Sequence, residues 1–179
     1  ISFNTISIIS GTGYVSSNFE HWGNYASVLF LLLMFIGGCA GSTTGGLKIF
    51  RFQILFKYIH LHLKRMLQPH MVLSSKFNGK KIPESTYESV MTFFFIYIIT
   101  FAASALLLSF SGLDFLTCIS AAASAISNVG PGLGEIIGPE GNYSSLSNYS
   151  KSVLILTMFL GRLEMLTIFV LFIPSFWKN

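Results

Sequence analysis

Long apolar stretches alternate with short polar segments along the chain, and three of these stretches are long enough to cross a membrane as helices. They cover about residues 26–56, 90–110 and 153–173. A spanning helix needs about 20 apolar residues. Glycines interrupt the first stretch, the second has no charged residue, and the third is apolar except for Arg162 and Glu164. The pattern predicts three spanning segments.

Two shorter apolar stretches each end in a glycine-rich turn. Residues 115–126 follow Asp114, a good helix N-cap, and lead into Asn128-Val-Gly-Pro-Gly-Leu-Gly134. Residues 4–14 end similarly, in Ser10-Gly-Thr-Gly-Tyr14. Such stretches are too short to span, and irregular backbone is tolerated at membrane depth only inside protein or beside water. We therefore expect a re-entrant segment at residues 115–126 and the tail of a second one at residues 4–14.

Composition and charge agree with a membrane protein. Of the 179 residues, 52% are hydrophobic and 10% are charged, whereas soluble domains carry roughly 25% charged residues. Lysine and arginine gather between Lys48 and Lys81, a segment without Asp or Glu. A basic run can indicate nucleic-acid binding, but between apolar stretches it is typical of a cytoplasmic segment, and we expect no nucleic-acid partner. Because the chain opens at Ile1, in what reads as the middle of an element, we expect it to be a fragment.

An internal repeat relates the two halves. Met34-Phe-Ile-Gly-Gly38 resembles Met158-Phe-Leu-Gly-Arg162, and a glycine turn precedes each. The expected unit is a span, a short pore helix, a glycine turn and a second span. The chain would hold the latter part of one unit and all of the next. Four segments are expected: residues 1–56 as the end of the earlier unit, 57–85 as a basic cytoplasmic linker, 86–174 as the complete unit and 175–179 as a C-terminal tail.

The glycine turns are candidates for an ion-selectivity filter. Glycine reaches backbone angles that other residues reach poorly, and a row of pore-facing carbonyls needs such angles. Gly13 and Gly130 occupy these positions, each after a re-entrant candidate and before a span. An isolated Gly-x-Gly is usually an ordinary loop turn, but this placement favours a filter. Because about four such loops surround a filter, the others would come from elsewhere in the protein or from partner chains.

A glycine-rich segment interrupts the first predicted span. It contains hydroxyl residues as well as glycines, which favours a mobile gating loop in an ion path. The alternative is a glycine-softened helix that packs closely against its neighbours. A phosphate-binding loop is excluded because no Gly-Lys-[Ser/Thr] follows. The residues concerned are Gly37, Gly38, Gly41, Ser42, Thr43, Thr44, Gly45 and Gly46.

Arg162 is a charge deep within the third predicted span. Such a charge costs at least about 2.5 kcal/mol to insert, so it should face a cavity or a partner. By its place in the repeat it matches Gly38, which would put it near the glycine-rich segment as an electrostatic brake on cations. The alternative is a structural pair with a carboxylate. Glu164 does not share the helix face of Arg162, so we expect it to have a different partner. Both interpretations of Arg162, the brake on cations and the structural pair, stay open.

No constellation of residues suggests an enzyme or a bound cofactor. The histidines of the basic segment lie among lysines, where a solvated face is expected rather than a metal site. Ser42 has no histidine within a spanning segment to act as its base. We therefore expect a non-enzymatic chain without a cofactor of its own.

Three motifs in this order resemble those of Trk-type (TrkH/TrkG) potassium uptake proteins, within the Trk/Ktr/HKT superfamily, and the likeness covers essentially the whole chain. They are Gly37-Gly-Cys-Ala-Gly-Ser-Thr-Thr-Gly-Gly-Leu-Lys48, Asn128-Val-Gly-Pro-Gly-Leu-Gly134 and Leu160-Gly-Arg-Leu-Glu164. The resemblance implies an all-α integral membrane protein built like a potassium channel, with four span–pore helix–span repeats around one pseudo-fourfold pore. The chain would hold the end of repeat three and all of repeat four.

The resemblance also implies roles for particular residues. The potassium filter would comprise Thr12, Gly13, Asn128, Val129 and Gly130. Residues 37–46 would form the intramembrane gate, and Arg162 would be the pore arginine beneath the filter. Potassium would be the transported ion. The first turn reads Gly11-Thr-Gly-Tyr14, where the family leads us to expect Thr-Thr-Gly-Phe, so the affinity of that site could differ.

Partners and location follow from the same likeness. Relatives work as homodimers in the bacterial inner membrane with a cytoplasmic nucleotide-binding regulatory ring, and the linker Lys57–Lys81 is a plausible docking surface for that ring. Two other interpretations remain open. The chain could belong to a related system, such as a sodium-coupled Ktr-type transporter or the potassium subunit of a P-type pump. It could also be a membrane scaffold that transports nothing and whose glycines only pack helices.

Overall fold

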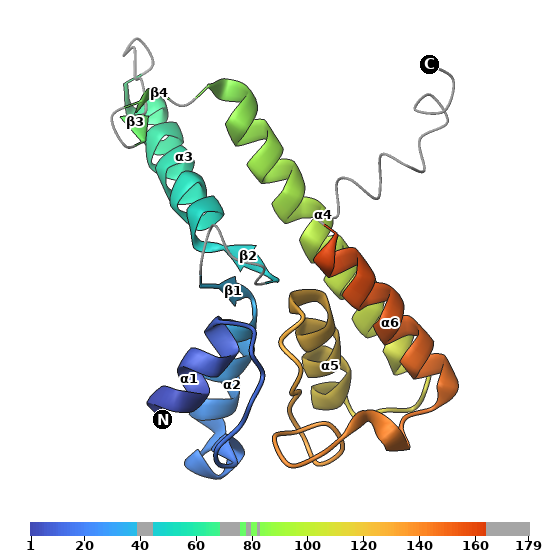
Figure 1. Cartoon of the computed structure of the whole chain (residues 1–179). Helices are drawn as coiled ribbons and strands as arrows, with labels where there is room; N and C mark the ends of the chain where they lie inside the picture. The colour runs from blue at the N-terminus through green and yellow to red at the C-terminus, as the bar shows by residue number, and fades with distance from the viewer. Residues whose placement is uncertain (39–44, 69–75, 78–79, 82, 164–179) are drawn as a thin grey trace, which may run out of the picture.

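The computed structural model describes residues 1–38, 45–68, 76–77, 80–81 and 83–163 (Figure 1). Within these residues the chain is mostly helical. The helices are α1 (Ser2–Ile9), α2 (Asn24–Met34), α3 (Ile49–Leu67), α4 (Glu84–Ser109), α5 (Phe115–Ser127) and α6 (Asn148–Arg162), with short 3-10 helices η1 (Phe19–Trp22) and η2 (Tyr143–Ser145). The strands have two residues each: β1 (Ile36–Gly37), β2 (Leu47–Lys48), β3 (Lys76–Phe77) and β4 (Lys80–Lys81).

The helix α4 is the clearest membrane span. Among the described residues, only the stretch Ser85–Ser109 is long and apolar enough to cross a bilayer by length and composition. Its end follows the sequence signal at Ser111-Gly112. The Ser111 amide donates to the Leu108 carbonyl at 3.0 Å, and Gly112 adopts a φ of +71° that favours glycine. The second predicted span is therefore confirmed as a helix.

The first predicted span consists of two separate helices. α2 ends at Met34, and α3 begins at Ile49. Between them β1 pairs in parallel with β2, and the Leu47 amide donates to the Phe35 carbonyl at 2.9 Å. The predicted interruption of the helix is confirmed, and a parallel pair of two-residue strands lies at the break. This strand pair is a local feature of a chain whose described residues are otherwise mostly helical, as the expected all-α fold class requires.

The helix α3 extends beyond the first predicted span, whose expected end is at about residue 56. It contains neither glycine nor proline and runs from Ile49 through Leu67. In the linker that follows, β3 pairs antiparallel with β4. The third predicted span is described as far as Leu163, since α6 ends at Arg162 and residues 164–179 lie outside the described part.

The helix α5 lies in the lower part of Figure 1, between α1 and α2 on one side and α4 and α6 on the other. Of its 13 residues, 10 are buried, most of them alanine and serine. Small side chains let the neighbouring helices approach closely. The Asp114 side chain caps the helix by accepting from the Leu116 amide at 3.2 Å. The short helix predicted after Asp114 is therefore confirmed, one residue longer than expected.

Candidate functional site

The two glycine turns meet in space. A Cβ added to Gly13 would overlap the carbonyl oxygen of Val129, and one added to Gly130 would lie 3.9 Å from the Gly13 Cα. Both glycines have positive φ, +75° at Gly13 and +114° at Gly130, which side-chain-bearing residues adopt rarely. Glycine is therefore needed at Gly13 for the close approach and at both positions for the backbone conformation.

The second turn directs its amide groups back onto the end of α5. The amides of Asn128 and Val129 donate to the carbonyls of Ala125 at 3.2 Å and Ser124 at 3.1 Å. The Gly130 amide donates to the Ser124 hydroxyl at 3.1 Å. In a planar trans peptide the preceding carbonyl points opposite to the N–H. The carbonyls of residues 127, 128 and 129 consequently point away from α5.

The first turn has the same arrangement at the end of α1. The Gly11 amide donates to the Ile8 carbonyl at 3.1 Å, while those of Thr12 and Gly13 both donate to Ser7, at 2.9 and 3.3 Å. The carbonyls of residues 10–12 therefore point away from α1. Asn4, which is 1% exposed, holds the loop segment that leaves this turn, since its side chain accepts from Ser16 and donates to the Ser17 carbonyl.

The Gly130 carbonyl differs from the carbonyls of residues 127–129, because a side chain donates to it. It accepts a hydrogen bond of 2.7 Å from the Tyr143 hydroxyl. Burial raises the pKa of that hydroxyl, an effect opposed in part by its hydrogen bond with Ser124, so it keeps its proton in neutral solution. Sequence reasoning missed both Ser124 and Tyr143. No local pattern marks Tyr143, because it reaches Gly130 from a separate loop.

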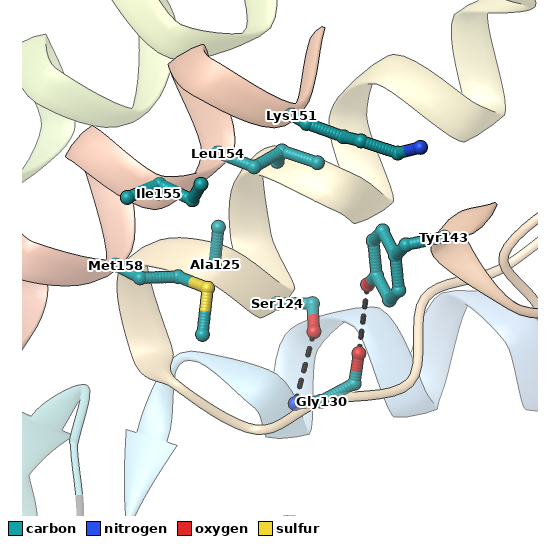
Figure 2. A pocket seen from close by; sticks show the side chains of 8 residues that line it. All are labelled: Ser124, Ala125, Gly130, Tyr143, Lys151, Leu154, Ile155 and Met158. Atoms are coloured by element: carbon teal, nitrogen blue, oxygen red, sulfur yellow. Dashed lines mark hydrogen bonds between the residues drawn. The ribbon is translucent and has the colours of Figure 1, made fainter. Parts of the chain in front are cut away.

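A pocket of about 370 Å³ borders this glycine (Figure 2). Its walls come from α5, α6 and the loop that carries Tyr143, and Figure 2 shows the Ser124 and Tyr143 side chains reaching Gly130 from the pocket side. The lining is mostly apolar, with Lys151 at one end. The residues that line the pocket are Ser124, Ala125, Gly130, Tyr143, Lys151, Leu154, Ile155 and Met158.

Both flanks of the glycine-rich segment lie against the ends of the short helices. The Gly38 amide donates to the Ile9 carbonyl at 2.9 Å, and an added Cβ there would lie 3.1 Å from that oxygen. A Cβ on Gly45 would overlap the Ser127 carbonyl. Gly37 approaches Gly45 across the strand pair, and Gly46 has a φ of +75°. The remaining predicted gate residues, Gly41, Ser42, Thr43 and Thr44, lie outside the described residues.

The end of α6 packs against the second turn. Asn128, in the left-handed conformation at φ 54° and ψ 41°, donates through its side-chain amide to the Met158 carbonyl at 3.2 Å. A Cβ on Gly161 would overlap the Ile126 carbonyl. Arg162 is the last residue of α6, and its side chain is exposed. Glu164, expected to have a different partner, lies outside the described residues.

A metal centre built from side chains is not found in the described part of the chain, where no group of three or more His, Cys, Asp or Glu residues comes together. The oxygen atoms that the two turns direct away from their helices are backbone carbonyls. Hard monovalent cations are bound in protein pores by such carbonyls, which replace the water shell of the ion.

Comparison with known proteins places these features in context. The chain matches the model of the TrkH family, described as cation transport protein, over residues 2–179. It is 44% identical over 179 residues to the Trk system potassium uptake protein TrkI of Halomonas elongata, covering 100% of this chain and 36% of that protein. It is 38% identical over 177 residues to the Trk system potassium uptake protein TrkH of Escherichia coli K12, covering 99% of this chain and 36% of that protein.

A solved structure has the same fold. The crystal structure of the potassium transporter TrkH from Vibrio parahaemolyticus superimposes with a TM-score of 0.88 at 38% identity, covering 98% of this chain and 37% of that one. The chain therefore spans little more than a third of the length of the relatives it matches.

Proposed function

The chain belongs to the TrkH family of cation transport proteins, and from this premise we propose that it supplies two of the four filter turns of a potassium uptake pore. The pore would lie in a bacterial inner membrane, crossed several times by the complete protein. Potassium is the transported ion in this proposal, and the chain needs no cofactor and catalyses no reaction. The relatives that the chain matches are potassium uptake proteins, which favours this function over that of a pump subunit or a scaffold.

One observation supports the filter above all others. Two turns that touch each other both direct successive amides onto a short helix, so both present successive carbonyls on the opposite side. A row of carbonyls is what a potassium filter requires. We assign the ion-facing oxygens to residues 10–12 and 127–129. Gly13 and Gly130 then provide the backbone conformation, and the Gly130 carbonyl is committed to Tyr143 instead.

The internal repeat is supported by equivalent hydrogen bonds. When Gly13 is aligned with Gly130, Ser7 corresponds to Ser124, and each serine carbonyl accepts from the residue before the glycine, at 2.9 and 3.1 Å. We propose that α1 and α5 are pore helices of successive repeats, with α2 and α6 as the inner helices that follow them. The domain division at residues 56, 85 and 174 and the pseudo-fourfold arrangement belong to the same proposal.

A gate below the filter is the second part of the proposal. The glycines Gly38 and Gly45 contact the ends of the helices α1 and α5, directly behind the two turns. A movement of the segment between these glycines would therefore displace the filter turns. Arg162 at the end of α6 would add a positive charge to the cation path. We also propose that the complete protein is a homodimer and that a cytoplasmic nucleotide-binding subunit docks at Lys57–Lys81, a range that includes Lys64 and Arg65 in the basic last turn of α3.

Rubidium uptake tests the filter assignment. The complete gene product would be expressed in cells that lack potassium transport, with Gly130→Ser compared with Gly112→Ser at matched membrane levels. Both glycines have positive φ, +114° and +71°, but nothing lies within 4 Å of a Cβ at Gly112. We expect Gly130→Ser to reduce uptake or the preference for rubidium over sodium, while Gly112→Ser keeps both. Normal, selective uptake by Gly130→Ser would overturn the filter.

A further inference from the structure

We propose that Ser124 and Tyr143 act together as a clamp on Gly130 and thereby set the ion discrimination of the second turn. The inference rests on the proposed function, since it concerns the same turn. Neither residue would touch the ion. Each is a positioning residue that acts through the backbone, and each holds one of the two peptide planes that meet at Gly130.

Ser124 holds the plane between Val129 and Gly130. Its hydroxyl accepts from the Gly130 amide at 3.1 Å, and the residue is 2% exposed within α5. Because the peptide is planar and trans, the Val129 carbonyl must point in the opposite direction. That direction leads to Gly13, whose added Cβ would overlap the Val129 oxygen. The serine hydroxyl therefore orients a carbonyl that faces the neighbouring turn.

Tyr143 holds the next plane, between Gly130 and Pro131. Proline has no amide hydrogen, so the Gly130 carbonyl is the only group of this peptide that can form a strong hydrogen bond. The Tyr143 hydroxyl donates to it at 2.7 Å. The usual means of fixing a turn, an amide bonded to a nearby carbonyl, is missing at this position, and the tyrosine replaces it.

Few atoms pack against Gly130 on the side where a side chain would lie. A Cβ added to it would meet a single atom within 4 Å, the Gly13 Cα at 3.9 Å, and the pocket of about 370 Å³ lies beside it. Glycine has more accessible backbone conformations than any other residue. A glycine in open space at φ +114° needs hydrogen bonds to stay in one conformation, and Ser124 and Tyr143 provide them (Figure 2).

The tyrosine itself is anchored to α6. It begins the short helix η2, whose start is capped by Asn142 accepting from the Ser144 amide at 2.9 Å. Lys151 of α6 donates to the Ser144 carbonyl at 2.7 Å. The Tyr143 ring lines the pocket opposite Leu154 and Ile155 of α6 (Figure 2). The clamp therefore joins the filter turn to the inner helix through the outer loop.

The test compares two tyrosines that would each lose only a hydroxyl. Tyr143→Phe keeps the ring but removes the donor to Gly130, while Tyr149→Phe makes the same change at an exposed residue of α6. The measured quantity is the ratio of rubidium uptake without and with competing sodium, by the complete gene product. This ratio does not depend on how much protein reaches the membrane, so a loss of folded protein alone would leave it unchanged.

We expect Tyr143→Phe to lower discrimination by roughly two- to tenfold, the factor that corresponds to one hydrogen bond, and Tyr149→Phe to leave it unchanged. Ser124→Ala should also lower the discrimination. If Tyr143→Phe does not reach the membrane, the test uses Ser124→Ala alone. Unchanged discrimination in both clamp variants, together with a loss in Gly130→Ser, would overturn the clamp and leave the filter standing. Normal discrimination in Gly130→Ser as well would overturn the filter itself.

Discussion

Gly13 lies directly against the carbonyl of Val129, so closely that a Cβ at Gly13 would overlap the oxygen. The two residues belong to different copies of the proposed repeat and are far apart in the sequence. Their contact joins the two glycine turns into one site.

Replacing Gly13 with alanine should disrupt both turns. The new Cβ would overlap the Val129 oxygen and would occupy a backbone conformation, φ +75°, that alanine adopts at a cost of about 1 kcal/mol or more. We expect rubidium uptake to fall at least about tenfold, which corresponds to about 1.4 kcal/mol. The matched control is Gly112→Ala, with similar φ and open space. Equal uptake by the two variants would contradict the contact.

Glu20, in η1, ties the segment after the first turn to the end of the second turn. Its carboxylate accepts from the Gly134 amide at 2.5 Å, and hydrogen bonds to charged groups contribute about 1.5–3 kcal/mol. We expect Glu20→Ala to lower the melting temperature of the purified complete protein. Glu20→Gln should lower it less, because the amide oxygen still accepts. The control is Glu140→Ala, which removes an exposed carboxylate of the outer loop. If this control lowered the melting temperature as much as Glu20→Ala does, the hydrogen bond between Glu20 and Gly134 would not be the cause.

Asn128 combines a left-handed backbone with a side-chain tether to α6. Glycine at this position would lose the tether to Met158 but would adopt the conformation without strain, whereas alanine would lose the tether and add strain. We predict that Asn128→Ala is less stable than Asn128→Gly by about 1 kcal/mol. Thermal unfolding of both purified variants measures the difference. The reverse order of stability would show that the left-handed conformation is not required.

Arg162 should slow cation passage if it faces the pore as proposed. Removing its charge in Arg162→Ala should raise rubidium flux several-fold, as the loss of roughly 1 kcal/mol of repulsion would produce. Arg162→Lys keeps the charge and should behave like the unchanged protein. Whole-cell current or rubidium flux at matched membrane levels measures the effect. A flux that falls equally in both variants would instead support a structural pairing of the arginine.

Much of the local structure could be predicted because its causes are local. The Asp114 cap, the stop at Gly112 and the charge-free run before it each act within a few residues, and the helices α4 and α5 follow them closely. The break after Met34 was also predictable from its glycines. What followed the break was not, because the strand pair joins Ile36 to Leu47, and pairing across an irregular segment leaves no periodic signal.

In the candidate site, too, some features have local causes and others depend on contacts between distant segments. The sequence by itself determined which glycines form the turns, because a turn after a short apolar helix needs residues that tolerate positive φ. It also determined that the chain is a membrane protein, through its apolar runs. Only the tertiary structure decided that Gly13 meets Val129, that Gly134 is held by Glu20, and that Tyr143 takes the Gly130 carbonyl. These contacts join separate segments, so they depend on how α1, α2, α5 and α6 pack together, which no local pattern specifies.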